Sequence, residues 1–189
     1  MKKIAILIVG LFLTLQSLPL YSEESNTQEF SIEGIRIGDR ADDHFTGREL
    51  AMAISNEFNH LSNIGFYVHN FRNKKPINNY DYAFKEYDYV RIITKQDDGR
   101  LFYVHGVTAL MRYEDINDCY SKHDKIVKEL SSNQKVQEVT TPPPDDPKNT
   151  VTEVSFADKW SRVMCLNKEK VLVNQMFSTD ALEWIGGRK

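Results

Sequence analysis

A predicted amphipathic helix at Asp115–Leu130 constrains the fold of this chain more than any other stretch. Its apolar and half-polar residues recur at spacings of three and four, so one stripe of the helix must be buried. The members of the stripe are Ile116, Cys119, Tyr120, His123, Ile126, Val127 and Leu130. A strand-like run, Leu101–Tyr113, leads directly into it. We therefore expect the strands of the chain to gather around this helix.

The two cysteines, Cys119 and Cys165, indicate a single disulfide. Cys119 lies in the buried stripe, and Cys165 lies in a strand-like run far along the chain. In an exported chain, two cysteines usually pair. The alternative is a metal pair of Cys119 and His123, which are four residues apart on one helix face. Two ligands do not make a metal site, so the sequence favours the disulfide.

The N-terminus has the layout of a secretory signal. Lys2 and Lys3 precede an almost wholly apolar run, Ile4–Leu15, and cleavage is expected after Ser22. The run is too short for a comfortable membrane span, which needs about 20 residues. We thus expect residues 1–22 to be removed, residues 23–29 to form a polar lead-in, and the mature protein to lie in the periplasm or outside the cell. An uncleaved N-terminal anchor is the alternative.

The size and charge of the mature chain favour one domain without a nucleic-acid partner. Cleavage removes two of the 24 basic residues and no acidic residue, which leaves 22 against 27 and a net charge of −5. The charges are interspersed and form no basic run, so neither nucleic acid nor an anionic membrane is expected as a partner. The length suits one ordinary domain with its own core.

Before the central helix, hydrophobic periodicity and turn residues predict several elements. The capping box of Thr46 and Glu49 opens a helix that should run to about Asn59. The remaining elements are a strand at Phe30–Ile37 with a bulge at Gly34, a helical turn capped by Asp39 and ending at Phe45, a strand at Ile64–Phe71, and a hairpin of Tyr87–Lys95 with Arg100–Tyr113.

After the central helix, prolines predict a long exposed loop at residues 131–149, since proline cannot donate to a strand ladder. Three strands should follow, and Ser178 should cap a short helix, Thr179–Ile185. The strands are Thr150–Phe156, Lys159–Leu166 and Val171–Phe177. Residues 30–189 are therefore expected to form a single α+β domain, with a mainly antiparallel sheet of six to seven strands, two main helices and a short C-terminal helix.

No local catalytic, phosphate-binding or metal-binding motif is present in the sequence. One repetition suggests a ligand platform. Phe66–His69 and Phe102–His105 have the same four residues, Phe-Tyr-Val-His, each within a predicted strand. Alternation sends Tyr and His to one face of a strand, so neighbouring strands would bring Tyr67, His69, Tyr103 and His105 together. The alternative is a structural role, in which these rings simply occupy the half-exposed face of a sheet.

The other titratable clusters are better explained by structure than by chemistry. Asp42, Asp43 and His44 could begin a metal site with His60, but acidic residues in a first helical turn are favoured by the helix dipole. His123 lies on the apolar stripe and is expected to pack in the core. We therefore assign no catalytic residue, no metal ligand and no cofactor.

Three stretches together resemble a family of small exported proteins of unknown function from SAR11-type marine alphaproteobacteria. These stretches are Phe30–Asp39, Asp118–Leu130 and Thr150–Phe156. The sequence departs from the pattern at Arg40-Ala41, where an apolar pair is expected, so the first helical turn should be more exposed here. A looser likeness is to small periplasmic domains of the outer-membrane assembly lipoprotein and lactamase-inhibitor type. The resemblance implies export and the order of strands and helices, and it implies no activity.

These observations predict an exported binding or interaction module without catalysis, whose partner is a protein or a small molecule. Two alternatives remain at this point. The first is a metal-assisted periplasmic hydrolase that uses His69, His105 and a nearby Asp. The second is an envelope assembly factor tethered to the membrane by an uncleaved N-terminus.

Overall fold

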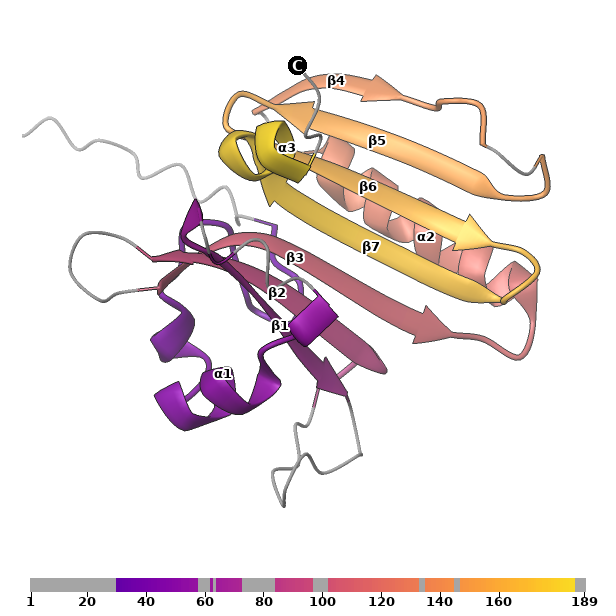
Figure 1. Cartoon of the computed structure of the whole chain (residues 1–189). Coiled ribbons are helices and arrows are strands. Elements are labelled where there is room, and N and C mark those ends of the chain that lie inside the picture. Colours follow the sequence, from indigo (N-terminus) through magenta and orange to yellow (C-terminus); the bar gives the residue numbers. More distant parts are fainter. Residues whose placement is uncertain are drawn as a thin grey trace, which may run out of the picture.

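The computed structural model describes residues 30–57, 62, 64–72, 84–96, 102–132, 135–144 and 147–185. Within these residues a seven-stranded antiparallel sheet has the order β1-β2-β3-β7-β6-β5-β4 (Figure 1). Its strands are β1 (Phe66–Arg72), β2 (Tyr89–Gln96), β3 (Phe102–Arg112), β4 (Val136–Thr140), β5 (Thr150–Phe156), β6 (Lys159–Leu166) and β7 (Val171–Ser178). The last strand therefore lies at the centre of the sheet.

The helices cover both faces of this sheet. The long helix α2 (Ile116–Ser131) packs behind β5, β6 and β7 in the view of Figure 1, and α3 (Thr179–Ile185) crosses the front. The short helix α1 (Gly47–Ala53) and the 3-10 turn η1 (Ala41–Asp43) lie beside β1 and β3. This arrangement is an α+β fold, as the sequence predicts.

The main core lies between the sheet and α2. Asp115 caps α2 by accepting a hydrogen bond from the Asn117 N–H, and the helix then buries Cys119, Ile126 and Leu130 against the sheet. A smaller cluster on the opposite face joins Phe177 of β7 to Ala181 of α3. Ser178 caps α3 as predicted, because its Oγ accepts a hydrogen bond from the Ala181 N–H at 3.2 Å.

A disulfide between Cys119 and Cys165 ties α2 to β6. Both cysteines are fully buried, and their Cα atoms are 6.0 Å apart. This bond confirms the predicted pairing and occupies the thiol that a metal pair with His123 would need. His123 itself is buried in the core, as the helix periodicity indicates.

The helix opened by Thr46 is shorter than predicted. Its capping box is present, since Thr46 Oγ1 accepts from the Glu49 N–H at 3.2 Å. However, α1 ends at Ala53 rather than near Asn59. Ile54 turns into extended backbone and bridges to His69 at the outer edge of β1. A tertiary pairing with the sheet therefore ends the helix before its local periodicity does.

The predicted strand at Phe30–Ile37 is a tight turn instead. Ile32 and Ile35 exchange both backbone hydrogen bonds, at 3.1 and 3.0 Å. Glu33 and Gly34 between them have φ of 56° and 82°. Positive φ at both central positions is the signature of a type I′ turn. Gly34 is thus a turn residue and not a bulge.

Two further predictions were wrong. Asp39 does not cap the helical turn: η1 begins after Arg40 and has no side-chain cap, while Asp39 Oδ2 accepts from the Arg36 N–H at 2.9 Å. The Pro-rich loop at residues 131–149 contains β4, which pairs with β5 across an irregular register. In η1, Ala41 is fully buried whereas Asp42 and Asp43 are exposed, so only part of this turn has the exposure that the sequence predicts.

Candidate functional site

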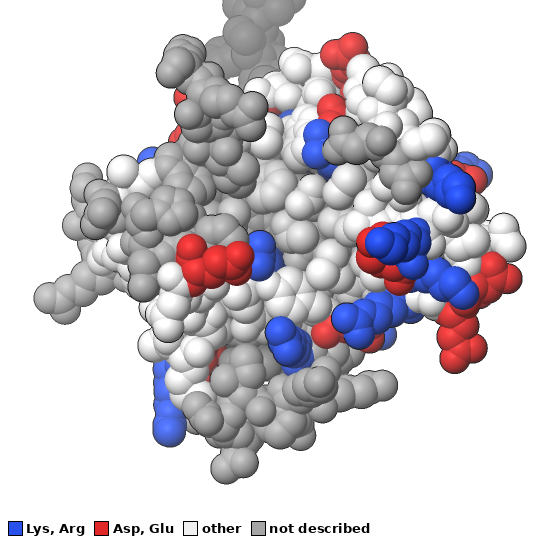
Figure 2. Space-filling view, turned by 45° about the vertical axis from the view of Figure 1, so that its right-hand side comes forward, with Lys and Arg blue, Asp and Glu red and all other residues white. Residues whose placement is uncertain are grey.

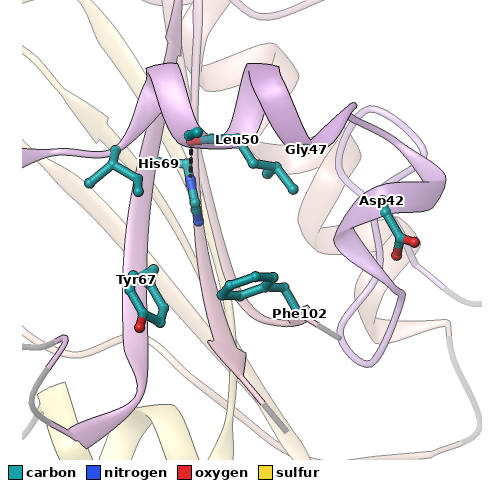
Figure 3. A pocket seen from close by; sticks show the side chains of 8 residues that line it. Asp42, Gly47, Leu50, Tyr67, His69 and Phe102 are labelled. Carbon is teal, nitrogen blue, oxygen red and sulfur yellow. Dashed lines mark hydrogen bonds between the residues drawn. The ribbon is translucent and has the colours of Figure 1, made fainter. Parts of the chain in front are cut away.

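A pocket of about 310 Å³ lies between α1 and the strands β1 and β3 (Figure 3). It is lined mainly by apolar groups, and its walls come from elements distant in sequence. The lining residues are Asp42, Gly47, Leu50, Ala51, Ile54, Tyr67, His69 and Phe102. A pocket of this size is at the lower end of the range of small-molecule sites.

His69 forms the inner end of the pocket and is held on both sides of its ring. Its Nδ1 lies 2.8 Å from the Leu50 carbonyl oxygen, and its Nε2 lies 3.0 Å from Thr94 Oγ1. A carbonyl can only accept, so Nδ1 carries the proton and Nε2 accepts from the Thr94 hydroxyl. Burial lowers the pKa of His69, which keeps the ring neutral.

Both nitrogens of His69 are therefore used within the protein. The ring has no lone pair left for a metal ion and no free N–H for a substrate. It contributes a flat wall to the pocket and joins α1 to β1 and β2. This geometry makes His69 a structural residue of the pocket rather than a general base.

Two aromatic rings form the outer wall. Tyr67 and Phe102 meet edge to face, with ring centroids 5.3 Å apart and an interplanar angle of 83°. Ile54 stands at the edge of the pocket and is 42% exposed, which is unusual for a large aliphatic side chain. The pocket therefore offers an apolar surface to a molecule that enters from solvent.

The sheet separates the four rings predicted to share a face. Phe66 pairs with Lys95, which pairs with Tyr103, so the register offset from β1 to β3 is 37 residues up to the irregularity between Ile93 and Thr94 and 38 residues beyond it. The repeated sequence has an offset of 36, so at Phe66 and Tyr67 it is one residue out of register, which places Tyr67 and Tyr103 on opposite faces. His105 lies at the irregularity, and its ring packs against Phe66, on the face opposite to His69. Tyr67 and His69 consequently lie on the α1 face, whereas Tyr103 and His105 lie on the opposite face.

Tyr103 and His105 line a separate pocket of about 360 Å³ with Gly38 and Lys95. His105 Nδ1 is 3.0 Å from Ser178 Oγ, and the His105 ring packs edge-on against Phe66 at 5.7 Å. His69 and His105 cannot ligate one metal ion because the sheet lies between them. The prediction that the four rings share one face is thus wrong. The metal site formed by both His69 and His105, which the hydrolase alternative requires, is excluded for the same reason.

The remaining candidates behave as structural residues. His44 Nε2 is 2.8 Å from Asp39 Oδ2, and Asp42 pairs with Arg40, an interaction that lowers the pKa of Asp42. His60 lies outside the described residues, so its suggested site with Asp43 is not seen. Among the described residues, no group of three or more His, Cys, Asp or Glu side chains is placed to hold a metal ion.

Charges of both signs are mixed on the surface. Figure 2 shows Lys and Arg side chains beside Asp and Glu side chains on the face it presents, around a largely uncharged centre. Across β5 and β6, Arg162 Nε donates a hydrogen bond to Glu153 Oε1 at 2.8 Å. This part of the surface therefore has no field of a single sign.

Two residues of note were missed by sequence reasoning. The Glu33 carboxylate accepts hydrogen bonds from the N–H groups of Lys85, Glu86 and Tyr87, at 2.9, 2.7 and 3.0 Å. Asn174 is buried in the middle of β7. For Asn174 a signal exists, because alternation places it inward between two apolar residues. For Glu33 no local signal exists, since its partners lie more than fifty residues away.

The comparisons with known proteins add no relative. No protein family model, no curated protein and no solved structure matches the chain. Within the described part of the chain, no helix is both long enough and apolar enough to cross a membrane.

Proposed function

We propose that this protein is an exported, non-catalytic binding protein whose pocket under α1 takes a compact apolar group. The observation that carries the proposal is the pocket itself. It has a volume of about 310 Å³, and its lining is mainly apolar. An apolar ligand that replaces water there gains the free energy of burying its own surface and that of Tyr67, Phe102 and Ile54.

The chemistry of His69 supports binding over catalysis. The one imidazole in the pocket is neutral and fully hydrogen-bonded, to Leu50 and Thr94. A general base must reach a substrate proton with a free lone pair. His69 could do so only after giving up its bond to Thr94, which is fully buried.

Export of the protein is part of the proposal. The buried Cys119–Cys165 disulfide is a type of bond that persists in oxidising compartments. The signal-like N-terminus and the resemblance to small exported marine alphaproteobacterial proteins support the same location. Residues 1–22, on which cleavage or tethering depends, lie outside the described residues.

The test uses 4-fluorotoluene as an apolar probe and ¹⁹F NMR on the oxidised, exported protein. We expect saturable binding whose affinity does not depend on salt concentration, because the probe is uncharged. The variant Ala51→Leu narrows the pocket at a lining position, and it should weaken binding at least tenfold. Ala157→Leu adds the same three carbon atoms at an exposed turn and should bind like the wild type.

Two results would contradict this proposal. One is the absence of saturable binding by the wild type at probe concentrations up to its solubility. The other is equal binding by the wild type and Ala51→Leu, with both chains folded by circular dichroism. Either result would remove the pocket under α1 as the functional site.

A further inference from the structure

A second cavity lies over β7, on the same face of the sheet as α2. It also has a volume of about 310 Å³, and it is lined by α2, β7, the turn at Glu33 and the segment around Tyr87. Its lining differs from that of the pocket under α1, because it combines apolar walls from Phe30 and Ile126 with many polar groups. It therefore suits a different ligand.

A buried amide oxygen on one wall of this cavity lacks a partner. Asn174 lines the cavity and is 1% exposed. Its Nδ2 donates to the Tyr87 hydroxyl at 2.9 Å, while its Oδ1 has no hydrogen-bond partner among the described residues. A buried acceptor without a donor is costly, so such a group points to a molecule that supplies an O–H or N–H.

The backbone around the cavity is built to be stable without the ligand. Glu33 has positive φ, which is unfavourable for a residue with a side chain, and its carboxylate is held by three backbone N–H groups from residues 85–87. The ion pair of Lys122 and Glu86, at 2.7 Å, joins α2 to the same segment. Contacts within the protein thus hold the walls of the cavity in place without a ligand.

The charge of the lining indicates a ligand without net charge. Three acidic and three basic residues line the cavity, namely Glu33, Glu86, Glu129, Lys85, Lys122 and Lys125. Because these charges balance, the lining presents no net charge that would favour an anion or a cation over a neutral ligand. The desolvation free energy of a neutral O–H group facing Asn174 is smaller than that of an ammonium group.

We propose that this cavity binds a neutral, polyhydroxylated molecule of about monosaccharide size, with one hydroxyl donated to Asn174 Oδ1. The remaining hydroxyls meet the carboxylates and ammonium groups at the rim, and the C–H face of the ring lies against Phe30 and Ile126. Such a ligand satisfies the orphan acceptor and matches both the polar rim and the apolar walls. The inference is independent of the pocket under α1.

The experiment is a ¹H–¹⁵N NMR titration of the full oxidised protein with D-glucose, D-galactose and D-mannose. D-glucosamine and D-glucuronate serve as charged analogues of the same ring, and L-alanine serves as a zwitterion. We expect at least one neutral hexose to shift the signals of α2 and β7 saturably, and at least tenfold more tightly than either charged analogue.

Variants locate the site. Asn174→Leu removes the orphan oxygen at similar volume and should weaken binding at least tenfold. Gln175→Leu, on the other face of the same strand, should not change it. If Asn174→Leu fails to fold, Ser31→Phe fills the cavity from its rim, leaves Asn174 in place and should have the same effect.

Three outcomes would overturn the proposal. The first is that no neutral hexose binds, which means that the cavity holds water alone. The second is that L-alanine or a charged analogue binds more tightly, which assigns the site to another class of ligand. The third is that Asn174→Leu, or Ser31→Phe in its place, binds as the wild type does. None of these results affects the apolar pocket, which is tested with a different probe.

Discussion

Breaking the Cys119–Cys165 disulfide should lower the free energy of unfolding by about 4 kcal/mol. The bond closes a loop with a sequence separation of 46 residues. In the chain-entropy model a loop of this length restricts the unfolded state by about 13 cal/mol/K, which corresponds to about 4 kcal/mol at 25 °C. For a domain of this size that loss lowers Tm by about 8–16 °C.

The assay is urea unfolding of the oxidised protein, of the reduced protein and of the variant with both cysteines replaced by Ala. The reduced protein keeps both sulfur atoms, so its difference from the oxidised protein measures the cross-link. The Ala variant also loses packing at two fully buried positions, so it should be less stable still. The urea m-value should rise on reduction, because the unfolded chain becomes less compact.

A reduced protein within about 1 kcal/mol of the oxidised protein, with equal m-values, would refute this reasoning. It would mean that the unfolded chain is already compact around the two cysteines, or that the bond strains the native packing of α2 on β6.

Three shorter predictions concern single residues. Gly106→Ala should destabilise the fold by about 1–3 kcal/mol in urea unfolding, because an added Cβ would lie 2.6 Å from Cδ1 of the buried Phe177 ring; an unchanged midpoint would contradict the crowding. Burial lowers the folded-state pKa of His69 below its unfolded value. The neutral ring therefore stabilises the folded protein above about pH 6.5, and this stabilisation is lost as the pH falls from there toward the folded pKa. The loss is at most about 1.4 kcal/mol per pH unit. Comparison of the wild type with His69→Phe between pH 7 and 5 should show this loss only in the wild type, and parallel curves would count against it. Glu33→Ala leaves three backbone N–H groups without their acceptor and should cost about 2 kcal/mol in urea unfolding, whereas Lys168→Ala, at an exposed turn, should stay within about 0.5 kcal/mol of the wild type.

Local patterns were sufficient to predict most of the fold. The helix at α2 and the three final strands follow from periodicity, and their boundaries in the structure agree to within a residue or two. The capping box at Thr46 is also present where it was predicted. These elements bury one regular face, so their local and tertiary preferences coincide. The disulfide was predicted on a different basis, because a chain expected to be exported contains two cysteines, of which Cys119 lies in the apolar stripe of the helix.

The errors occur where long-range contacts override a local preference. Bridging of Ile54 to β1 ends α1 early, and the carboxylate of Glu33 holds a turn where the sequence reads as a strand. In β4, the register shifts between Val136 and Glu138, which removes the alternation that would identify a strand. None of these contacts can be read from neighbouring residues.

The candidate sites were less predictable than the fold. Sequence reasoning selected Tyr67 and His69, which do line a pocket, but it joined them to Tyr103 and His105 because the register between β1 and β3 was unknown. A shift of one residue decides which face a ring occupies. The cavity at Asn174 depends on four separate elements of the chain, and no local motif describes it.

The central position of β7 also sets the order in which the described sheet can be completed during synthesis. The strand that joins β1-β2-β3 to β6-β5-β4 is the last of these seven strands to leave the ribosome. Until residues 171–178 emerge, β3 and β6 each present an unpaired edge, and unpaired edges are templates for aggregation. The nascent chain thus carries two incomplete half-sheets until β7 emerges, and a deletion within β7 would harm folding more than a deletion of equal length in the edge strand β4.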